Sequence, residues 1–229
     1  MTGLLVWMVF IGAGPGHAAA MEGKVDLNAL IAETQKLSEK TSEMTLIWWI
    51  PLEFWAATFA QDPNMTPAQT EDFLKVLRPY TLLAVVDGTV GTFGGITYKP
   101  EALIRSNLTL RDGKGASIPP IETGAVSGDV INLIQMMKPI LANMLGPMGE
   151  NFNFYIFPAS TPEGVVIADG KKKGAFSVKL DTREFRWKLP LDSLLTPKTC
   201  AKCKETCKGS WDYCPWCGTK LGARGSAGK

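Results

Sequence analysis

The spacing of apolar residues changes from a helical to a strand period within the first fifty residues. After Asp26, five residues at helical spacing share one face of a helix, namely Leu27, Leu30, Ile31, Thr34 and Leu37. It predicts a surface helix of about 14 residues with Asp26 as its N-cap. Residues 44–50 (MTLIWWI) are apolar on both faces, with Leu46 and Trp48 opposite Ile47 and Trp49. They predict a strand in the centre of a sheet.

Two short helices are predicted next, each with a proline at its start. Pro51 is tolerated there because the first helical turn has no partner for its missing N–H, and an apolar stripe that includes Trp55 follows it. Thr66 caps the second helix, which has Pro67 at its first position and ends before Pro79.

From Tyr80 onward the pattern is typical of strands separated by turns. Four successive strands are predicted at residues 81–88, 91–99, 104–115 and 116–121, with turns at Asp87-Gly88 and Asp112-Gly113. They would form an antiparallel meander.

The rest of the body combines one helix with further strands. Ser127 begins a helical row that passes through Pro139 and is predicted to cover one face of the sheet. Strands are then predicted at residues 152–157, 164–168, 175–180 and 184–189. Residues 22–196 are therefore expected to form an α+β domain, mainly antiparallel sheet with a few covering helices.

The N-terminus has the order of a secretory signal peptide. An apolar run at residues 4–13 precedes Gly14-Pro15-Gly16 and an Ala-x-Ala site that ends at Ala20. Residues 1–20 are predicted to be removed, which gives a secreted or periplasmic protein with no transmembrane span in the mature chain. No Lys or Arg precedes the apolar run. The alternative is translation from Met21, which would give a cytoplasmic protein.

Composition and charge exclude several classes of function. The 229 residues carry a net charge of +2, too little to indicate nucleic acid as the main partner. His17 is the only histidine and lies in the predicted signal peptide. The mature chain would then lack Ser-His-Asp and Cys-His pairs and His-ligated metal sites. No catalytic residue is assigned, and an enzyme is the less favoured class.

All five cysteines lie in a basic tail that follows Pro197. Cys200 and Cys203 form one Cys-x2-Cys pair and Cys214 and Cys217 a second, with Cys207 between them. Two such pairs present four thiolates, the ligand set that structural Zn²⁺ accepts. A unit of about 30 residues cannot fold on apolar burial alone, so the metal would supply most of its folding free energy.

This tail resembles the zinc ribbon family, from Cys200 to about Leu221. Cys214-Pro215-Trp216-Cys217-Gly218 is similar to the family's Cys-Pro-x-Cys-Gly knuckle, whereas Lys204 stands where the first knuckle would have glycine. The resemblance implies a structural zinc ribbon at residues 198–222, followed by a flexible tail at 223–229.

Three questions about the tail remain open at this point. Either Cys200 or Cys207 could partner Cys203. Disulfides are an alternative to zinc, because export leads to an oxidising compartment. The Cys214–Cys217 pair also resembles a thioredoxin-type redox pair, although Gly218 follows it in place of a helix.

Candidate sites in the body have simpler structural interpretations. The aromatic cluster at residues 48–59 is expected to be core rather than a ligand groove. Glu53 could act as a general acid in an apolar pocket, but its place in a first helical turn favours interaction with the helix dipole. The glycines at 88–95 lie between two strands and lack a following Lys-Ser/Thr, so turns explain them better than a phosphate site.

Three hypotheses about function follow. The first is an exported, non-enzymatic protein whose zinc ribbon contacts its own body or another protein. The second is a carboxylate-based enzyme with a pocket near Glu53. The third is a cytoplasmic regulatory or nucleic-acid-binding protein that starts at Met21, with four lysines of the tail on one face, namely Lys202, Lys204, Lys208 and Lys220.

Overall fold

The computed structural model describes residues 25–222, except for the side chains of residues 140, 141 and 144. The predicted signal peptide at 1–20 and the predicted flexible tail at 223–229 lie outside this range. The described part has an α+β fold with antiparallel sheets, as expected. No helix within residues 25–222 has the length and apolar character needed to cross a bilayer.

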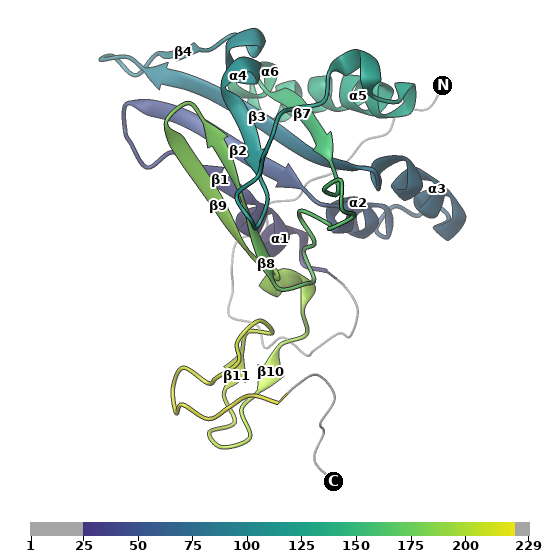
Figure 1. The fold of residues 1–229 in the computed structure, drawn as a ribbon, viewed down its shortest axis with the longest axis vertical. Coiled ribbons are helices and arrows are strands. Elements are labelled where there is room, and N and C mark those ends of the chain that lie inside the picture. The colour runs from purple at the N-terminus through teal and green to yellow at the C-terminus, as the bar shows by residue number, and fades with distance from the viewer. Residues whose placement is uncertain (1–24, 223–229) are drawn as a thin grey trace.

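A five-stranded antiparallel sheet forms the middle layer of the body (Figure 1). Its strands are β1 (Gln35–Leu37), β2 (Glu43–Ile50), β3 (Tyr80–Val90), β4 (Ile96–Tyr98) and β7 (Asn153–Pro158). The long β3 pairs with β2 along one edge and with β7 and β4 along the other. The run at residues 44–50 is thus a buried interior strand, as predicted.

A second sheet packs against the first. Its order is β6 (Ser117–Ile118), β5 (Leu108–Arg111), β8 (Gly174–Leu180) and β9 (Arg183–Leu189). The predicted single meander is wrong, because β4 and β5 belong to different sheets and a helix, α4 (Glu101–Asn107), connects them. The strand predicted at residues 164–168 is only an isolated bridge between Ser160 and Val166.

Helices cover the other face of the five-stranded sheet. They include α2 (Leu52–Phe59), α3 (Pro67–Leu77), α5 (Gly128–Leu145) and the short α6 (Pro147–Glu150). Thr66 and Gln69 form a capping box at the start of α3, as the sequence indicates. Val130 and Leu133 of α5 are buried against the sheet, which confirms that this helix covers one face.

Two hydrophobic cores lie on opposite faces of the middle sheet. Between the sheets, Trp49 of β2 meets the Phe176 ring edge to face at 4.9 Å, and Phe176 stacks on Trp187 at 4.9 Å. Beneath the helices, Trp48 and Trp55 are buried with their aliphatic neighbours. The aromatic cluster of the sequence is therefore divided between two cores.

The first helix is shorter than predicted. Helix α1 (Leu27–Thr34) has Asp26 as its N-cap, but Gln35–Leu37 form β1 and Leu37 is exposed. Thr34 is completely buried, and its carbonyl and hydroxyl accept hydrogen bonds from the indole N–H groups of Trp187 and Trp48 at 3.0 and 3.2 Å. These long-range bonds compete with continued helix, and pairing with β2 takes over.

Asp87, predicted at a turn, lies inside β3 and is buried between the sheets. Only 1% of its side chain is exposed. Its carboxylate accepts hydrogen bonds from the Arg183 guanidinium of β9 (2.8 Å) and the Thr45 hydroxyl (2.6 Å) and pairs with the Lys99 ammonium (2.8 Å). The turn prediction is wrong because two cations compensate the buried charge and allow the strand to continue.

Candidate metal centre

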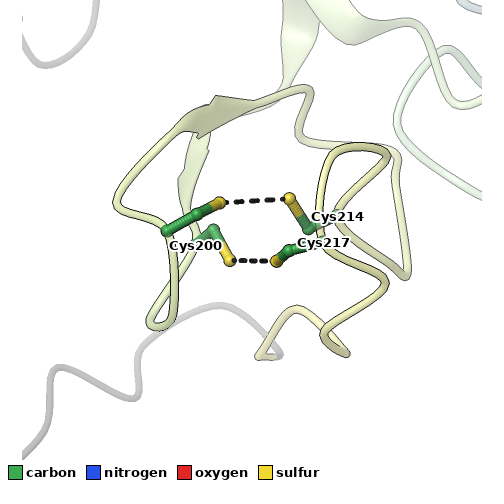
Figure 2. Close-up of side chains that lie close together, drawn as sticks. Cys200, Cys214 and Cys217 are labelled. Atoms are coloured by element: carbon green, nitrogen blue, oxygen red, sulfur yellow. Dashed lines mark hydrogen bonds between the residues drawn. The ribbon is translucent and has the colours of Figure 1, made fainter.

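Four of the five cysteines meet in the C-terminal segment (Figure 2). The Sγ atoms of Cys200, Cys203, Cys214 and Cys217 all lie within 4.8 Å of one another. The Sγ atoms of Cys200 and Cys217 are 3.5 Å apart, and those of Cys203 and Cys214 are 3.6 Å apart. Each close pair joins one Cys-x2-Cys turn to the other.

These distances fit a tetrahedral metal ion. Four sulfurs each about 2.3 Å from one ion lie about 3.8 Å from one another. A disulfide would require about 2.05 Å, and all five cysteines are free thiols. Cys200 therefore belongs to the group and Cys207 does not, and the group has the geometry of a metal site.

The two Cys-x2-Cys turns have the same backbone design. The N–H of Lys204 donates to the Cys200 carbonyl, and that of Gly218 donates to the Cys214 carbonyl, both at 2.9 Å. Lys204 and Gly218 have φ values of 62° and 71° in the left-handed region. Lys204 thus adopts the conformation for which glycine is the favoured residue.

Substitution of Lys204 by glycine is expected to strengthen metal retention. Relief of the left-handed strain, partly offset by the entropy of glycine in the unfolded chain, should be worth about 0.5–1 kcal/mol, or about two- to fivefold in affinity. Competition with a metal chelator measures this. Lys202→Gly removes the same charge from the same turn without a positive φ and should give no gain. Equal effects of Lys204→Gly and Lys202→Gly on metal affinity would contradict the strain that we assign to the positive φ of Lys204.

Polar neighbours favour the ionised form of one sulfur. The Thr219 hydroxyl lies 3.3 Å from the Cys217 Sγ. Hydrogen bonds from this hydroxyl and from the Thr219 backbone lower the pKa of Cys217 to about 6, despite partial desolvation. A thiolate at neutral pH is the form that ligates metals.

The segment that carries these cysteines, residues 198–222 with the short strands β10 (Lys198–Thr199) and β11 (Thr206–Cys207), is called the ribbon below and has almost no hydrophobic core of its own. The buried residues of this segment are Cys200, Cys207, Cys214 and Leu221, with Trp211 packed beside them. Cys207 lies in β11, which pairs with β10, and its thiol contacts the Glu205 carbonyl at 3.7 Å. Cys207 thus occupies a buried structural position beside the group.

The ribbon contacts the body through the turn at residues 192–196 and through an ion pair of 2.9 Å between the Lys173 ammonium and the Asp212 carboxylate. Asp192 accepts a hydrogen bond from the Ser210 N–H (3.1 Å) and lies 3.4 Å from the Lys208 ammonium. The carboxylate of Glu33 in α1 accepts hydrogen bonds from the N–H groups of Asp192 and Ser193, both at 3.0 Å. These bonds tie the turn to α1 and the ribbon to the turn.

Gly209→Ala is expected to loosen the ribbon from the body without releasing metal. An added Cβ would lie 2.5 Å from the Leu195 Cβ and 2.8 Å from the Thr196 carbonyl oxygen. Overpacking of this kind costs about 1–3 kcal/mol. Hydrogen exchange at Ser210 should accelerate, whereas Gly124→Ala, where nothing lies within 4 Å of the added atom, should leave it unchanged. Unchanged exchange in Gly209→Ala would contradict this contact.

The structure places Glu53 in the first turn of α2, partly buried. Its carboxylate lies 3.8 Å from the Lys171 ammonium. Glu53 lines neither the cavity between α4, α5 and β7 nor the small one beside Trp55. Nothing in this arrangement favours the general-acid role.

The other candidates of the body are turn residues. The glycines at 88–95 belong to the β3–β4 hairpin, where Gly94 has a positive φ of 83°. The Asp112 carboxylate accepts hydrogen bonds from the N–H groups of Lys114 (2.9 Å) and Ala116 (2.8 Å), which confirms a turn there. No local pattern indicates the buried ion pair of Asp87 and Arg183, because its partners lie 96 residues apart.

Comparisons with known proteins identify no relative from which a function could be transferred. No protein-family model, no curated protein and no solved structure matches this chain.

Proposed function

We propose that this chain is an exported, non-enzymatic α+β protein whose C-terminal ribbon, residues 198–222, holds one structural Zn²⁺ and contacts another protein. The observation that carries the proposal is the group of four free cysteine sulfurs within 4.8 Å of one another. The remaining support comes from the surface of the ribbon and from the sequence of the N-terminus.

The ligand chemistry supports zinc. A tetrahedral set of four thiolates suits Zn²⁺, and soft sulfur ligands disfavour Mg²⁺ and Ca²⁺. Four protein ligands close the coordination sphere and leave no position for substrate, so the ion's role is structural. The small core of the segment supports a metal that supplies folding free energy.

Exposed aromatic residues support an interaction role. Tyr213 and Trp216 in the second Cys-x2-Cys region are 59% and 60% exposed. Neither takes part in the contacts with residues 192–196, which come from Lys208, Gly209 and Ser210. Large exposed aromatic side chains are typical anchors of protein interfaces.

The charge of the ribbon supports a protein partner over nucleic acid. Residues 198–222 contain five lysines and two carboxylates, a balance of +3. Zn²⁺ bound to four thiolates adds −2, which leaves about +1. Within residues 25–222, Lys202, Lys204 and Lys220 form no ion pair, so they can face single carboxylates of a partner. A net charge this small provides little attraction for a phosphate backbone.

Export rests on the sequence of residues 4–20, which lie outside the described range. Protein recovered from the secreted or periplasmic fraction of its own source should have the intact mass of a chain that begins at Met21 or Glu22, whereas translation from Met21 would leave a chain of that mass in the cytoplasm. A denatured mass that includes Met1 would contradict the signal peptide.

Cross-linking in the source organism tests the interaction. Pro215 is exposed between Cys214 and Trp216. A photo-reactive residue at this position is expected to give a single adduct that contains one copy of the chain and one copy of one partner protein. The double variant Tyr213→Ser, Trp216→Ser should lose this adduct and keep its zinc. Phe93→Ser, which changes a fully exposed aromatic residue of the β3–β4 hairpin, is the control that should retain the adduct. An adduct that survives the double variant, or none in the wild type, would contradict the proposal.

A further inference from the structure

A cavity of about 230 Å³ lies between α4, α5 and β7. The segment 121–126 closes a further side and is held to β7 by a hydrogen bond of 2.7 Å from the Ile121 N–H to the Ile156 carbonyl. This volume is large enough for several water molecules or for a small organic ligand. It is distant in sequence from the cysteine tail and plays no part in the proposed metal site.

The lining divides into an apolar wall and a polar rim. Apolar side chains come from the closing segment, α5 and β7, namely Ile121, Val126, Ile131, Ile134, Phe154 and Ile156. The polar rim consists of Glu101, Arg105, Thr123, Gln135, Lys138 and Asn153. An apolar wall with a few convergent polar groups is the usual composition of a small-molecule site.

Arg105 is held in place on this rim by three contacts. Its Nε lies 2.7 Å from a Glu101 carboxylate oxygen, one turn earlier in α4. Its Nη1 donates to the Ile121 carbonyl at 3.4 Å, and its guanidinium lies over the Tyr155 ring at 5.2 Å. Burial raises the pKa of Tyr155, so the ring beneath the cation stays neutral. These contacts leave Nη2 of Arg105 without a partner among the described residues.

The rim has a net positive charge. Glu101 offsets Arg105, whereas Lys138 of α5 forms no ion pair within residues 25–222. Two cations and one carboxylate therefore leave a charge of +1 beside an apolar wall. A planar carboxylate can accept hydrogen bonds from the free Nη2 of the Arg105 guanidinium. An alkyl or aryl body can pack against the apolar wall.

We propose that this cavity binds a small organic monoanion, a carboxylate with an apolar body of about six carbon atoms. Arg105 and Lys138 receive the carboxylate at the rim. The body contacts Ile131, Ile134 and Phe154. Complementary charge and a preformed apolar wall select this ligand over amines and alcohols of the same length.

Titration of the full chain with sodium hexanoate, followed by protein NMR, tests the proposal. Saturable shifts are expected in α4, α5 and β7, and hexylammonium and hexanol should give none at the same concentrations. This comparison uses the wild-type chain, so it does not depend on the folding of any variant. Equal shifts with hexylammonium, or no saturable shift with hexanoate, would overturn the proposal.

Variants locate the two halves of the site. Arg105→Gln should weaken hexanoate binding about tenfold or more, because a charge-assisted hydrogen bond is lost. Glu101 is 43% exposed, so this substitution leaves no buried unpaired charge. Ile134→Trp should fill the cavity and abolish binding. Arg186→Gln removes an exposed arginine of β9 and should leave the affinity unchanged. Wild-type affinity in Arg105→Gln, or in a folded Ile134→Trp, would overturn the assignment.

Discussion

Substitution of Cys214 by serine is expected to release the metal and unfold residues 198–222 while the body stays folded. Cys214 is only 2% exposed and supplies one of the four sulfurs. Loss of a second-sphere partner already weakens metal sites 10–100-fold, so loss of a ligand should cost more than about 100-fold. The ribbon has too little apolar burial to remain folded without the ion.

Two measurements separate the ribbon from the body in this experiment. Zinc content should fall to zero, and the contact between the Trp211 and Trp216 rings, 6.0 Å apart, should be lost and change the fluorescence. The melting temperature of the body should change by less than about 4 °C, because its two cores do not include the ribbon.

Cys207→Ser is the matched control. Cys207 is equally buried, at 1% exposure, and lies in the same ribbon but outside the group of four sulfurs. The serine hydroxyl can donate to the Glu205 carbonyl that the thiol now contacts. This variant should keep one zinc per chain. Loss of metal from Cys207→Ser, or its retention by Cys214→Ser, would contradict the assignment of the ligands.

Asp87→Asn is expected to destabilise the body by about 3–5 kcal/mol, the usual cost of breaking a buried ion pair. The substitution preserves the shape of the side chain but removes the most buried carboxylate that Arg183 and Lys99 share; these cations are only 16% and 28% exposed and keep only the more exposed carboxylates of Asp181 and Glu43. Denaturant unfolding at pH 7 measures the loss. Asp72→Asn breaks an exposed pair with Lys75 on α3 and should change stability by less than about 1 kcal/mol.

The effect of Asp87 on stability should depend on pH. Burial alone would raise the pKa of Asp87, but hydrogen bonds from Arg183, Lys99 and Thr45 hold it below its ordinary value. The unfolded chain then binds the proton more tightly, so this stabilisation is complete above about pH 5 and decreases as the pH falls through the folded-state pKa. The difference between wild type and Asp87→Asn should therefore shrink in acid. A difference that is constant from pH 7 to pH 3 would contradict an ionised Asp87.

Local patterns predicted the features that depend on nearby residues. Two Cys-x2-Cys pairs place their sulfurs through short turns, so the spacing indicated a cluster of four cysteines, while the choice between Cys200 and Cys207 as the partner of Cys203 needed the structure. Residues 44–50 are apolar on both faces because β2 lies between two cores, and the continuous apolar run, in place of an alternating one, indicated this directly. The caps at Asp26 and Thr66 likewise involve only the next few residues.

Features that depend on distant residues could not be predicted. The end of α1 is set by Trp187, which donates to the carbonyl of Thr34 across 153 residues. Asp87 precedes glycine and matches a turn pattern, but the cations of Lys99 and of Arg183, 96 residues later, compensate its buried charge in the strand. Helix α4 is different, because it has a local sequence signal. Glu101 and Arg105 have the i, i+4 spacing of a helical ion pair, and Pro100 directly precedes them.

Native mass spectrometry of the full chain, purified from its own source without reductant, tests the metal site most directly. The mass should show one zinc ion per chain, lost on acidification, and the denatured chain should contain five free thiols. An apo chain in which two disulfides join the four cysteines would contradict the proposed zinc site.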